Sequence, residues 1–231
     1  MRNLYLTEIK SIKCKDFSLC NIETDELIDL NPYKDTYIRV KLPASYDNQK
    51  YMNELGFTWV DRMLLASVNL RKNNINLHKM IRLNVIETNT TLEDIYNIAY
   101  KSFPIDRRFH VAKDYNDHIA KQLINYYIHE VKIWLVCFFK DIPVGFIGLV
   151  EKNESDIEIH LAAVDEKYRT TGAANSLYAY ACKYCKNKGY KKLFGRISSL
   201  NMPVMNLLCA APPLLISSGR RGIIAEVRFP E

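Results

Sequence analysis

The sequence predicts an α/β protein with a mixed central sheet flanked by helices, preceded by a smaller N-terminal α/β domain. Two apolar runs, 133–139 and 144–150, are joined by a turn-like break at Lys140–Pro143 and are typical of a buried hairpin. A third strand, 157–164, leads into a helix at 174–187 whose apolar residues recur at helical spacing. Strands followed by a helix in this order indicate a sheet with helices packed against it.

The other elements follow from the same patterns, taken in chain order. Strands are predicted at 36–40, 64–70, 81–88, 193–197 and 222–229, and helices at 51–55, from Thr91, at 117–131 and from Asn201. Arg71–Asn74 is polar and is the best linker candidate. We therefore expect an N-terminal domain at 1–74 and a second domain at 75–231.

Length and composition set the class of protein. The 231 residues, 48% of them hydrophobic, suffice for one large core or two modest ones. No apolar run is long enough to cross a bilayer, and Met1–Leu4 lacks the apolar core of a signal peptide. We therefore expect a cytoplasmic protein without a membrane partner.

The net charge of +6 results from 32 Lys and Arg against 26 Asp and Glu. Such a balance suits a phosphorylated small molecule and would equally suit nucleic acid. Because the basic residues are scattered along the chain, we favour a solvated surface and expect no nucleic-acid partner.

The six cysteines are expected to be reduced in a cytoplasmic protein. Cys182 and Cys185 stand one helical turn apart near the end of the predicted helix. A zinc site would need a second such pair, which the sequence lacks, and a redox pair usually stands at a helix start. We therefore expect packing roles for both thiols and no metal site.

The turn Arg169–Ala174 joins the third strand to its helix. A Gly-containing turn that opens a helix presents unpaired N–H groups and the positive end of the helix dipole, which together form an anion site. It lacks the Gly-Lys-Ser/Thr of a P-loop and the three spaced glycines of the dinucleotide fingerprint. Pyrophosphate would suit this turn, and a plain strand-to-helix connection with Arg169 facing solvent is the alternative.

This order of elements resembles the GNAT superfamily of acyl-CoA-dependent N-acyltransferases over roughly 83–207. In that family an Arg/Gln-x-x-Gly-x-Gly/Ala turn holds the CoA pyrophosphate, and the strand before it splays from its neighbour and pairs with pantetheine. The resemblance implies a GNAT-like fold, with acetyl-CoA as co-substrate. The implied binding residues are Leu161, Ala163 and Val164 on the strand, Arg169, Thr170, Thr171, Gly172, Ala173 and Ala174 in the turn, and Asn201 at the next helix.

Acetyl transfer to an amine requires a group that removes the proton of the amine. Glu158 and His160 alternate with apolar residues on the strand before the turn, so they share a face and are the catalytic candidates. A solvated strand face is the alternative interpretation. Direct attack by the amine is expected, because no Cys or Ser has an evident activating partner.

A narrower resemblance concerns the acceptor. Leu55–Phe57 and the stretch Ser102–Phe109 are similar to segments of N-acetyltransferases that act on an amino sugar carried by a nucleotide. This likeness implies a small-molecule amine, with Arg107, Arg108 and His110 in its binding site. Another small amine or a peptide stays open as acceptor, and a homodimer stays open as assembly.

The C-terminal part departs from the family pattern. Many GNAT enzymes place a Tyr seven residues beyond the position of Asn201 to protonate the leaving thiolate, and this chain has Leu208 there. Pro212 and Pro213 should end the helix soon afterwards. A reading-frame change near Leu207 and a divergent family member are both compatible with this tail. The favoured function is N-acetyl transfer, and the alternative is an acyl-CoA-binding protein with impaired catalysis.

Overall fold

The computed structural model describes residues 7–13, 18–24, 29, 32, 37–43, 45–71, 84–87, 91–103, 117–210, 215–216 and 222–228. Within these residues, eleven strands form one sheet. The strands are β1 (Thr7–Lys13), β2 (Ser18–Thr24), β3 (Tyr37–Pro43), β4 (Thr58–Asn69), β5 (Asn84–Glu87), β6 (Ile133–Phe139), β7 (Ile142–Glu151), β8 (Asp156–Val164), β9 (Lys192–Ser198), β10 (Leu215–Ile216) and β11 (Gly222–Arg228).

The sheet is mixed, as the sequence predicts. Its order is β1-β2-β3-β11-β4-β9-β8-β7-β6-β5, and β10 pairs with β4 outside this path. The pairs β2–β3 and β8–β9 are parallel, and the others are antiparallel. The predicted hairpin is β6–β7, and Lys140 in its turn has a φ of 56°.

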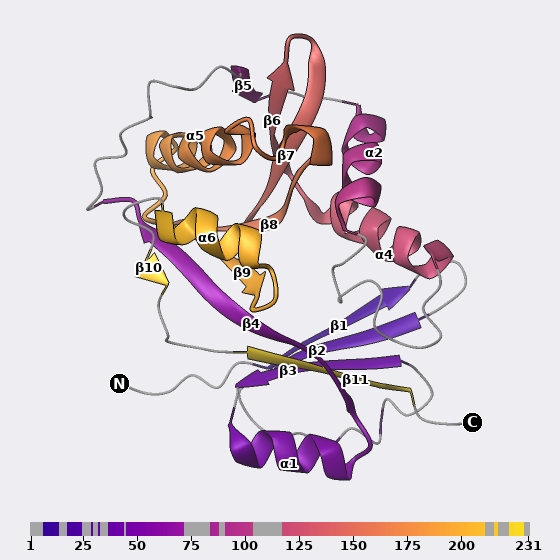
Figure 1. Cartoon of the computed structure of the whole chain (residues 1–231). Coiled ribbons are helices and arrows are strands. Elements are labelled where there is room, and N and C mark those ends of the chain that lie inside the picture. Colours follow the sequence, from indigo (N-terminus) through magenta and orange to yellow (C-terminus); the bar gives the residue numbers. More distant parts are fainter. Residues whose placement is uncertain are drawn as a thin grey trace.

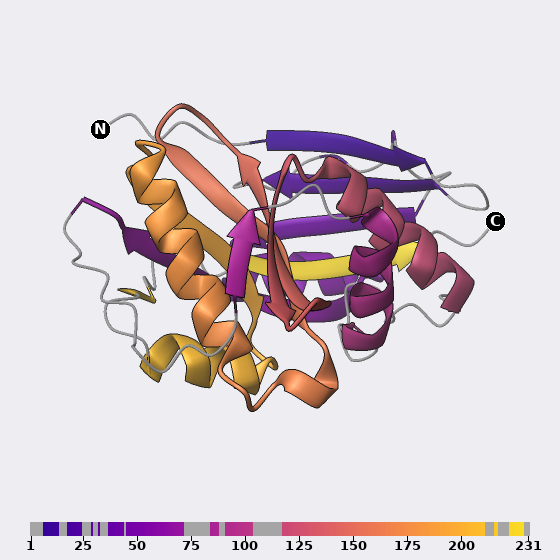
Figure 2. The same cartoon turned by 90° about the horizontal axis from the view of Figure 1, so that it is seen from above.

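Helices cover both faces of the β6–β8 part of the sheet, with α2 and α4 on one side and α5 on the other (Figures 1 and 2). Phe146 and Leu161 pack in the apolar cluster with α2 and α4, whereas Ile147 and Ile157 pack in the cluster with α5. The helices are α1 (Tyr46–Glu54), α2 (Leu92–Ser102), α4 (Asp117–Glu130), α5 (Ala173–Asn187) and α6 (Met202–Ala210), with the short 3-10 helix η2 (Glu166–Tyr168).

The N-terminal strands present two different faces. Ile38 and Val40 of β3 are buried in a cluster with Met52 of α1. Arg39 and Lys41 alternate with these residues in sequence and therefore point to the opposite face. That face is turned away from α1, which packs below the sheet in the view of Figure 1.

Most predicted elements are confirmed. Asn201 caps α6, because its Oδ1 accepts a hydrogen bond from the Val204 N–H at 3.3 Å. Thr91 caps α2, and its hydroxyl donates to Asp94 Oδ2 at 3.0 Å. Strands β1 and β2 have no counterpart among the predicted strands, because β1 places Ile9 and Ile12 three residues apart instead of alternating.

The sheet continues across residue 74, where the sequence predicts a domain boundary. β4 lies before this boundary and pairs with β9 from Met63–Ser198 to Asn69–Lys192. β11 lies between β3 and β4 and pairs with both. The division into two domains stays a prediction, and Arg71 is the one residue of the proposed linker within the described part of the chain.

Across the described ranges, none of the helices is both long and apolar enough to pass through a membrane.

Candidate functional site

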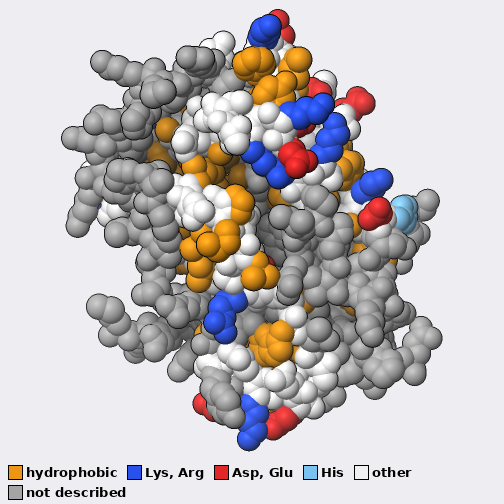
Figure 3. Space-filling model, viewed as in Figure 1, with side chains coloured by type: hydrophobic (Ala, Val, Ile, Leu, Met, Phe, Trp, Pro, Cys, Tyr) orange, Lys and Arg blue, Asp and Glu red, His pale blue; other side chains and the backbone are white. Residues whose placement is uncertain are grey.

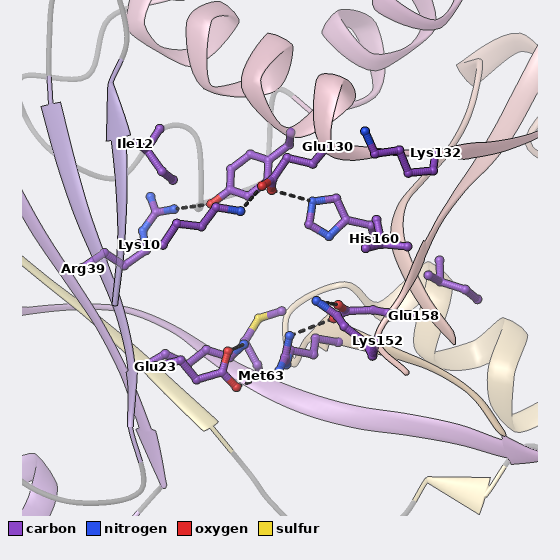
Figure 4. A pocket seen from close by; sticks show the side chains of 15 residues that line it. Lys10, Ile12, Glu23, Arg39, Met63, Glu130, Lys132, Lys152, Glu158 and His160 are labelled. Atoms are coloured by element: carbon purple, nitrogen blue, oxygen red, sulfur yellow. Dashed lines mark hydrogen bonds and ion pairs between the residues drawn. The ribbon is translucent and has the colours of Figure 1, made fainter. Parts of the chain in front are cut away.

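A cavity of about 380 Å³ lies between the N-terminal strands and β8. One wall comes from β1, β2 and β3, and the opposite wall from β8, β9 and the end of α4 (Figure 4). The residues that line it are Lys10, Ile12, Glu23, Arg39, Lys41, Met63, Tyr127, Glu130, Lys132, Val150, Lys152, Glu158, Ile159, His160 and Arg196. Both predicted catalytic residues, Glu158 and His160, are therefore in the same cavity.

A β-bulge in β8 places His160. β8 pairs with β7 at Leu161–Gly148 and at Ile159–Leu149, so His160 is the extra residue between these two pairs. A bulge re-aims a side chain and is frequent next to active sites. The imidazole of His160 points into the cavity from this position (Figure 4).

Glu158 is a buried carboxylate between two cations. Arg196 Nη1 donates to its Oε1 at 2.8 Å, and Lys152 Nζ lies 2.8 Å from its Oε2. Burial by itself would raise the pKa of Glu158, but the charges of Arg196 and Lys152 outweigh it and lower the pKa. Glu158 is therefore ionised at neutral pH and a weak base.

His160 has a carboxylate partner on α4. Its Nε2 lies 3.3 Å from Glu130 Oε2. Glu130 Oε1 in turn pairs with Lys10 of β1 and accepts a hydrogen bond from the Tyr126 hydroxyl at 3.3 Å. When the Nε2–H group donates a hydrogen bond to Glu130, Nδ1 keeps its lone pair and can accept a proton.

The N-terminal wall holds a second charged group. Glu23 of β2 accepts from Arg196 Nη2 at 2.6 Å and pairs with Lys41 Nζ at 3.2 Å. Burial and the nearby charge of Arg196 lower the pKa of Lys41 to about 8, against the opposing pull of Glu23. Arg196 thus joins the N-terminal wall to Glu158 on β8.

β8 and β9 separate beside this cavity. They pair in parallel only from Asp156–Lys192 to Ile159–Gly195, although β8 runs on to Val164 and β9 to Ser198. The splay that the family resemblance implies is therefore present. The backbone edge of β8 beyond Ile159 is not paired with β9.

The strand residues implied for the acetyl arm lie on both sides of β8. Leu161 and Ala163 pack with the α2 and α4 cluster, whereas Val164 packs with the α5 cluster. The Val164 carbonyl accepts from Ser102 Oγ at 3.3 Å and from Arg169 Nε at 3.4 Å. Because their side chains point in different directions, these residues can contact a linear group such as pantetheine through their backbone atoms.

The turn before α5 has the geometry of an anion site. Gly172 is the N-cap of α5 in the left-handed conformation, with a φ of 87°, and a Cβ there would meet no atom within 4 Å. The first N–H groups of an α-helix have no partner within the helix. Arg169, Thr170 and Thr171 beside them are exposed. These residues fit the pyrophosphate of CoA.

Three predicted acceptor residues, Arg107, Arg108 and His110, lie outside the described residues. Leu208 is in α6, as predicted.

Sequence reasoning missed most of the cavity. The cavity residues that it did not single out include Lys10, Glu23, Arg39, Lys41, Glu130 and Arg196. The available signal was in β3, where charged residues alternate with buried apolar ones, as in Arg39 and Lys41.

Cys182 and Cys185 are buried on α5, as expected for packing residues. Burial raises the pKa of Cys182 to about 11 and that of Cys185 to about 12, so both stay thiols at neutral pH. Among the residues that the structure describes, no three His, Cys, Asp or Glu side chains converge as metal ligands.

On the face shown in Figure 3, most described Lys and Arg side chains lie beside acidic ones. Among the described residues that line the cavity, six Lys or Arg residues outnumber three Glu residues.

Comparisons with known proteins agree with the GNAT-like fold that the sequence predicts. The family model described as the acetyltransferase (GNAT) family matches residues 92–208. A search of curated proteins finds no match.

Three solved structures with similar folds come from bacteria. A functionally unknown conserved protein from Staphylococcus epidermidis has a TM-score of 0.61 at 12% identity, over 92% of this chain and 85% of that chain. A GCN5-related N-acetyltransferase from Sphaerobacter thermophilus has a TM-score of 0.61 at 11% identity, over 92% of this chain and 74% of that chain. A GCN5-related N-acetyltransferase from Kribbella flavida has a TM-score of 0.60 at 10% identity, over 94% of this chain and 89% of that chain. At these identities the likeness concerns the fold.

Proposed function

The chain belongs to the GNAT acetyltransferase family, and from this premise we propose that it moves an acetyl group from acetyl-CoA to a primary amine held in the cavity. The observation that carries the proposal is the position of His160. This residue stands on the β8 bulge, next to the point where β8 and β9 separate, and it faces the cavity.

His160 is the proposed general base, and Glu130 is its positioning partner. A neutral imidazole with one nitrogen directed at a carboxylate keeps the other as proton acceptor. Glu158 is less suited to this role, because its lowered pKa and its two cationic partners stabilise the ionised form. We assign Glu158 an electrostatic role, which is to hold Arg196 and Lys152 in place.

In the proposed reaction the neutral amine attacks the thioester carbonyl carbon, and its nitrogen gives one proton to His160. The new N–C bond forms, the C–S bond breaks, and the thiolate takes a proton from water, whose hydroxide is neutralised by the proton held on His160. The turn at Arg169–Ala174 would hold the pyrophosphate, and the unpaired edge of β8 would hold the pantetheine arm. No acyl-enzyme is involved.

For the acceptor we propose an amino sugar on a nucleotide. The support is the resemblance of Leu55–Phe57 and Ser102–Phe109 to TDP-fucosamine N-acetyltransferase. An excess of positive side chains in the cavity also suits a phosphorylated acceptor. Another small amine or a peptide is the alternative.

The test is thiol release from acetyl-CoA with amino-sugar nucleotides as acceptors. Loss of the base should lower kcat by about a hundredfold or more in His160→Gln, with the affinity for acetyl-CoA nearly intact. His118→Gln is the matched control, because His118 is exposed on α4 and does not line the cavity. If Glu158→Gln abolished turnover while His160→Gln stayed active, the two roles would be reversed.

A second candidate function is binding of acetyl-CoA with slow turnover. It is favoured by Leu208, which stands where many GNAT enzymes have a Tyr and cannot donate a proton. We expect Leu208→Tyr to raise the rate of thiol release by about tenfold if thiolate protonation is limiting. Leu207→Tyr, one position earlier on α6, is the control. An unchanged rate in Leu208→Tyr, with the starting protein already active, would show that another group or water protonates the thiolate.

A further inference from the structure

On the premise of the proposed acetyl transfer, we infer that the acceptor amine carries an anionic group, a carboxylate or a phosphate, bound by Lys10 and Arg39 on the cavity wall of β1–β3. Both residues lie outside 92–208, the part of the chain that matches the family model. The N-terminal strands would then select the acceptor.

The strand register brings Lys10 and Arg39 into one row. Lys10 of β1 pairs with Asn21 of β2, and Asn21 pairs with Arg39 of β3. Neighbouring strands are 4.7–4.9 Å apart, so the Cα atoms of Lys10 and Arg39 are roughly 10 Å from each other. Both side chains line the cavity and extend from the same wall (Figure 4). Long cationic side chains at this spacing can converge on one anion.

The charges around the cavity favour an anion. Six Lys or Arg residues and three Glu residues of the described part of the chain line it, which is an excess of three positive charges with His160 neutral. Each carboxylate is shared between two partners. Glu23 pairs with Lys41 and Arg196, Glu158 with Lys152 and Arg196, and Glu130 with Lys10 and His160.

Arg39 has the chemistry of an anion receptor. Its side chain is buried, with the residue 3% exposed, and Nη1 donates to the Tyr127 hydroxyl of α4 at 3.4 Å. This contact holds the guanidinium across the cavity from β3 towards α4. A guanidinium presents a planar set of donors that matches a carboxylate or a phosphate.

The same cavity would activate the amine. Positive charge and burial disfavour an ammonium group, and Lys41 is a resident example, because the two effects lower its pKa to about 8. An acceptor amine beside His160 would therefore lose its proton more readily than in water. The neutral amine would not be attracted by the cavity charges, and the anionic group of the acceptor would bind to the cations instead.

The anion and the amine would lie close together. Glu130 contacts both Lys10 and His160, so a single carboxylate separates the cation from the proposed base. The cavity volume of about 380 Å³ is within the range of small-molecule sites.

Three sugars with the same amine test this inference: glucosamine, glucosamine 6-phosphate and muramic acid, which carry no anion, a phosphate and a carboxylate. Binding is measured by calorimetry with the protein saturated with coenzyme A, so that the turn before α5 is occupied. We expect at least one of the two anionic sugars to bind about tenfold more tightly than glucosamine. The sugar that binds more tightly shows whether the anionic group is a phosphate or a carboxylate.

Variants assign the effect to the proposed residues. Lys10→Gln should abolish the preference for the anionic sugar, and Arg39→Lys, which keeps the charge, should reduce it. Lys13→Gln is the matched control, because Lys13 is exposed on the same strand and does not line the cavity. Equal affinity for the three sugars, no measurable binding of any, or a preference that survives in Lys10→Gln would overturn the anion site.

The two proposals fail separately. If the anionic sugar bound in a Lys10-dependent way but neither these sugars nor the amino-sugar nucleotides caused thiol release, the anion site would stand and acetyl transfer would fall. If glucosamine were acetylated as fast as the anionic sugars and bound as tightly, acetyl transfer would stand and the anion site would fall.

Discussion

Lys41 shows what the cavity does to a single amine. Its side chain is 18% exposed and pairs with Glu23, yet burial and Arg196 lower its pKa from 10.5 to about 8. An unfolded chain keeps the ordinary lysine pKa. Folding therefore carries an electrostatic cost at Lys41 at neutral pH.

The sign of this cost gives a pH prediction. Below pH 8 both states hold the Lys41 proton, and the full cost is present. Between pH 8 and pH 10.5 the unfolded state binds more protons than the folded state, so the free energy of unfolding rises with pH. The rise attributable to Lys41 should be roughly 3 kcal/mol.

Urea unfolding at pH 7.5, 9 and 10.5 measures this effect. Lys41→Met should be more stable than the starting protein at pH 7.5, and the difference should shrink as the pH rises. Lys13→Met, at an exposed site of β1, should keep the pH dependence of the starting protein. An equal pH slope in Lys41→Met would contradict the lowered pKa.

Some of the residues that line the cavity could be predicted from the sequence, and others could not. Glu158 and His160 could be found because they alternate with apolar residues in the sequence of β8. Glu130 could not, because its link to His160 depends on how α4 packs against β8. Glu23 and Arg196 are 173 positions apart in the chain and meet only in the folded sheet.

At the scale of elements, the start of α5 is the feature on which CoA binding depends. Gly172 has a φ of 87°, and Gly189, just after the other end of α5, has a φ of 91°. A residue with a side chain is strained at either position, by roughly 1 kcal/mol. Only Gly172 stands at the helix N-terminus, where a carboxylate would compete with pyrophosphate.

Gly172→Glu and Gly189→Glu therefore form a matched pair. Calorimetric titration should show an acetyl-CoA affinity at least about tenfold lower in Gly172→Glu, and within about twofold of the starting protein in Gly189→Glu. Both variants should lose stability, and Gly189→Glu more of it, because a carboxylate is favoured at a helix N-terminus and disfavoured at a helix C-terminus. Equal affinity in Gly172→Glu would remove the turn from the CoA site.

Elements from β6 to α6 were the most predictable, because their signals are local, whereas β10 has no counterpart among the predicted strands. β6 has the predicted bounds, and α5 starts one residue before the predicted position. The β8 bulge at His160 is different, since it arises from the pairing of β8 with β7 and leaves no clear mark in the sequence.

At the scale of the whole molecule, the cavity requires both ends of the chain. In the described sheet, β1, β2 and β3 connect to β4 through β11, which pairs with β3 from Gly222–Pro43 to Arg228–Tyr37. A terminal strand at 222–229 is predictable from its apolar residues, but its place between β3 and β4 is not. Contacts between distant segments depend on packing and not on local pattern.

Removal of residues 211–231 tests this dependence. It would leave the facing edges of β3 and β4 unpaired and free the β1–β3 wall from the rest of the sheet. We expect the unfolding midpoint to fall by more than about 6 °C, which corresponds to a loss of at least about 2 kcal/mol. Thiol release should be lost, while acetyl-CoA affinity stays within about threefold, because β8 and α5 are retained.

The control is removal of residues 229–231, which leaves β11 complete. The same pair of truncations bears on the origin of the tail. A segment acquired through a reading-frame change near Leu207 would have no reason to complete a sheet that formed without it. If the chain without 211–231 melted at the same temperature and acetylated amines equally well, β11 would be dispensable, and the frame-change hypothesis would gain support. A large loss of both stability and thiol release, absent in the shorter truncation, would instead identify the tail as an integral part of the fold.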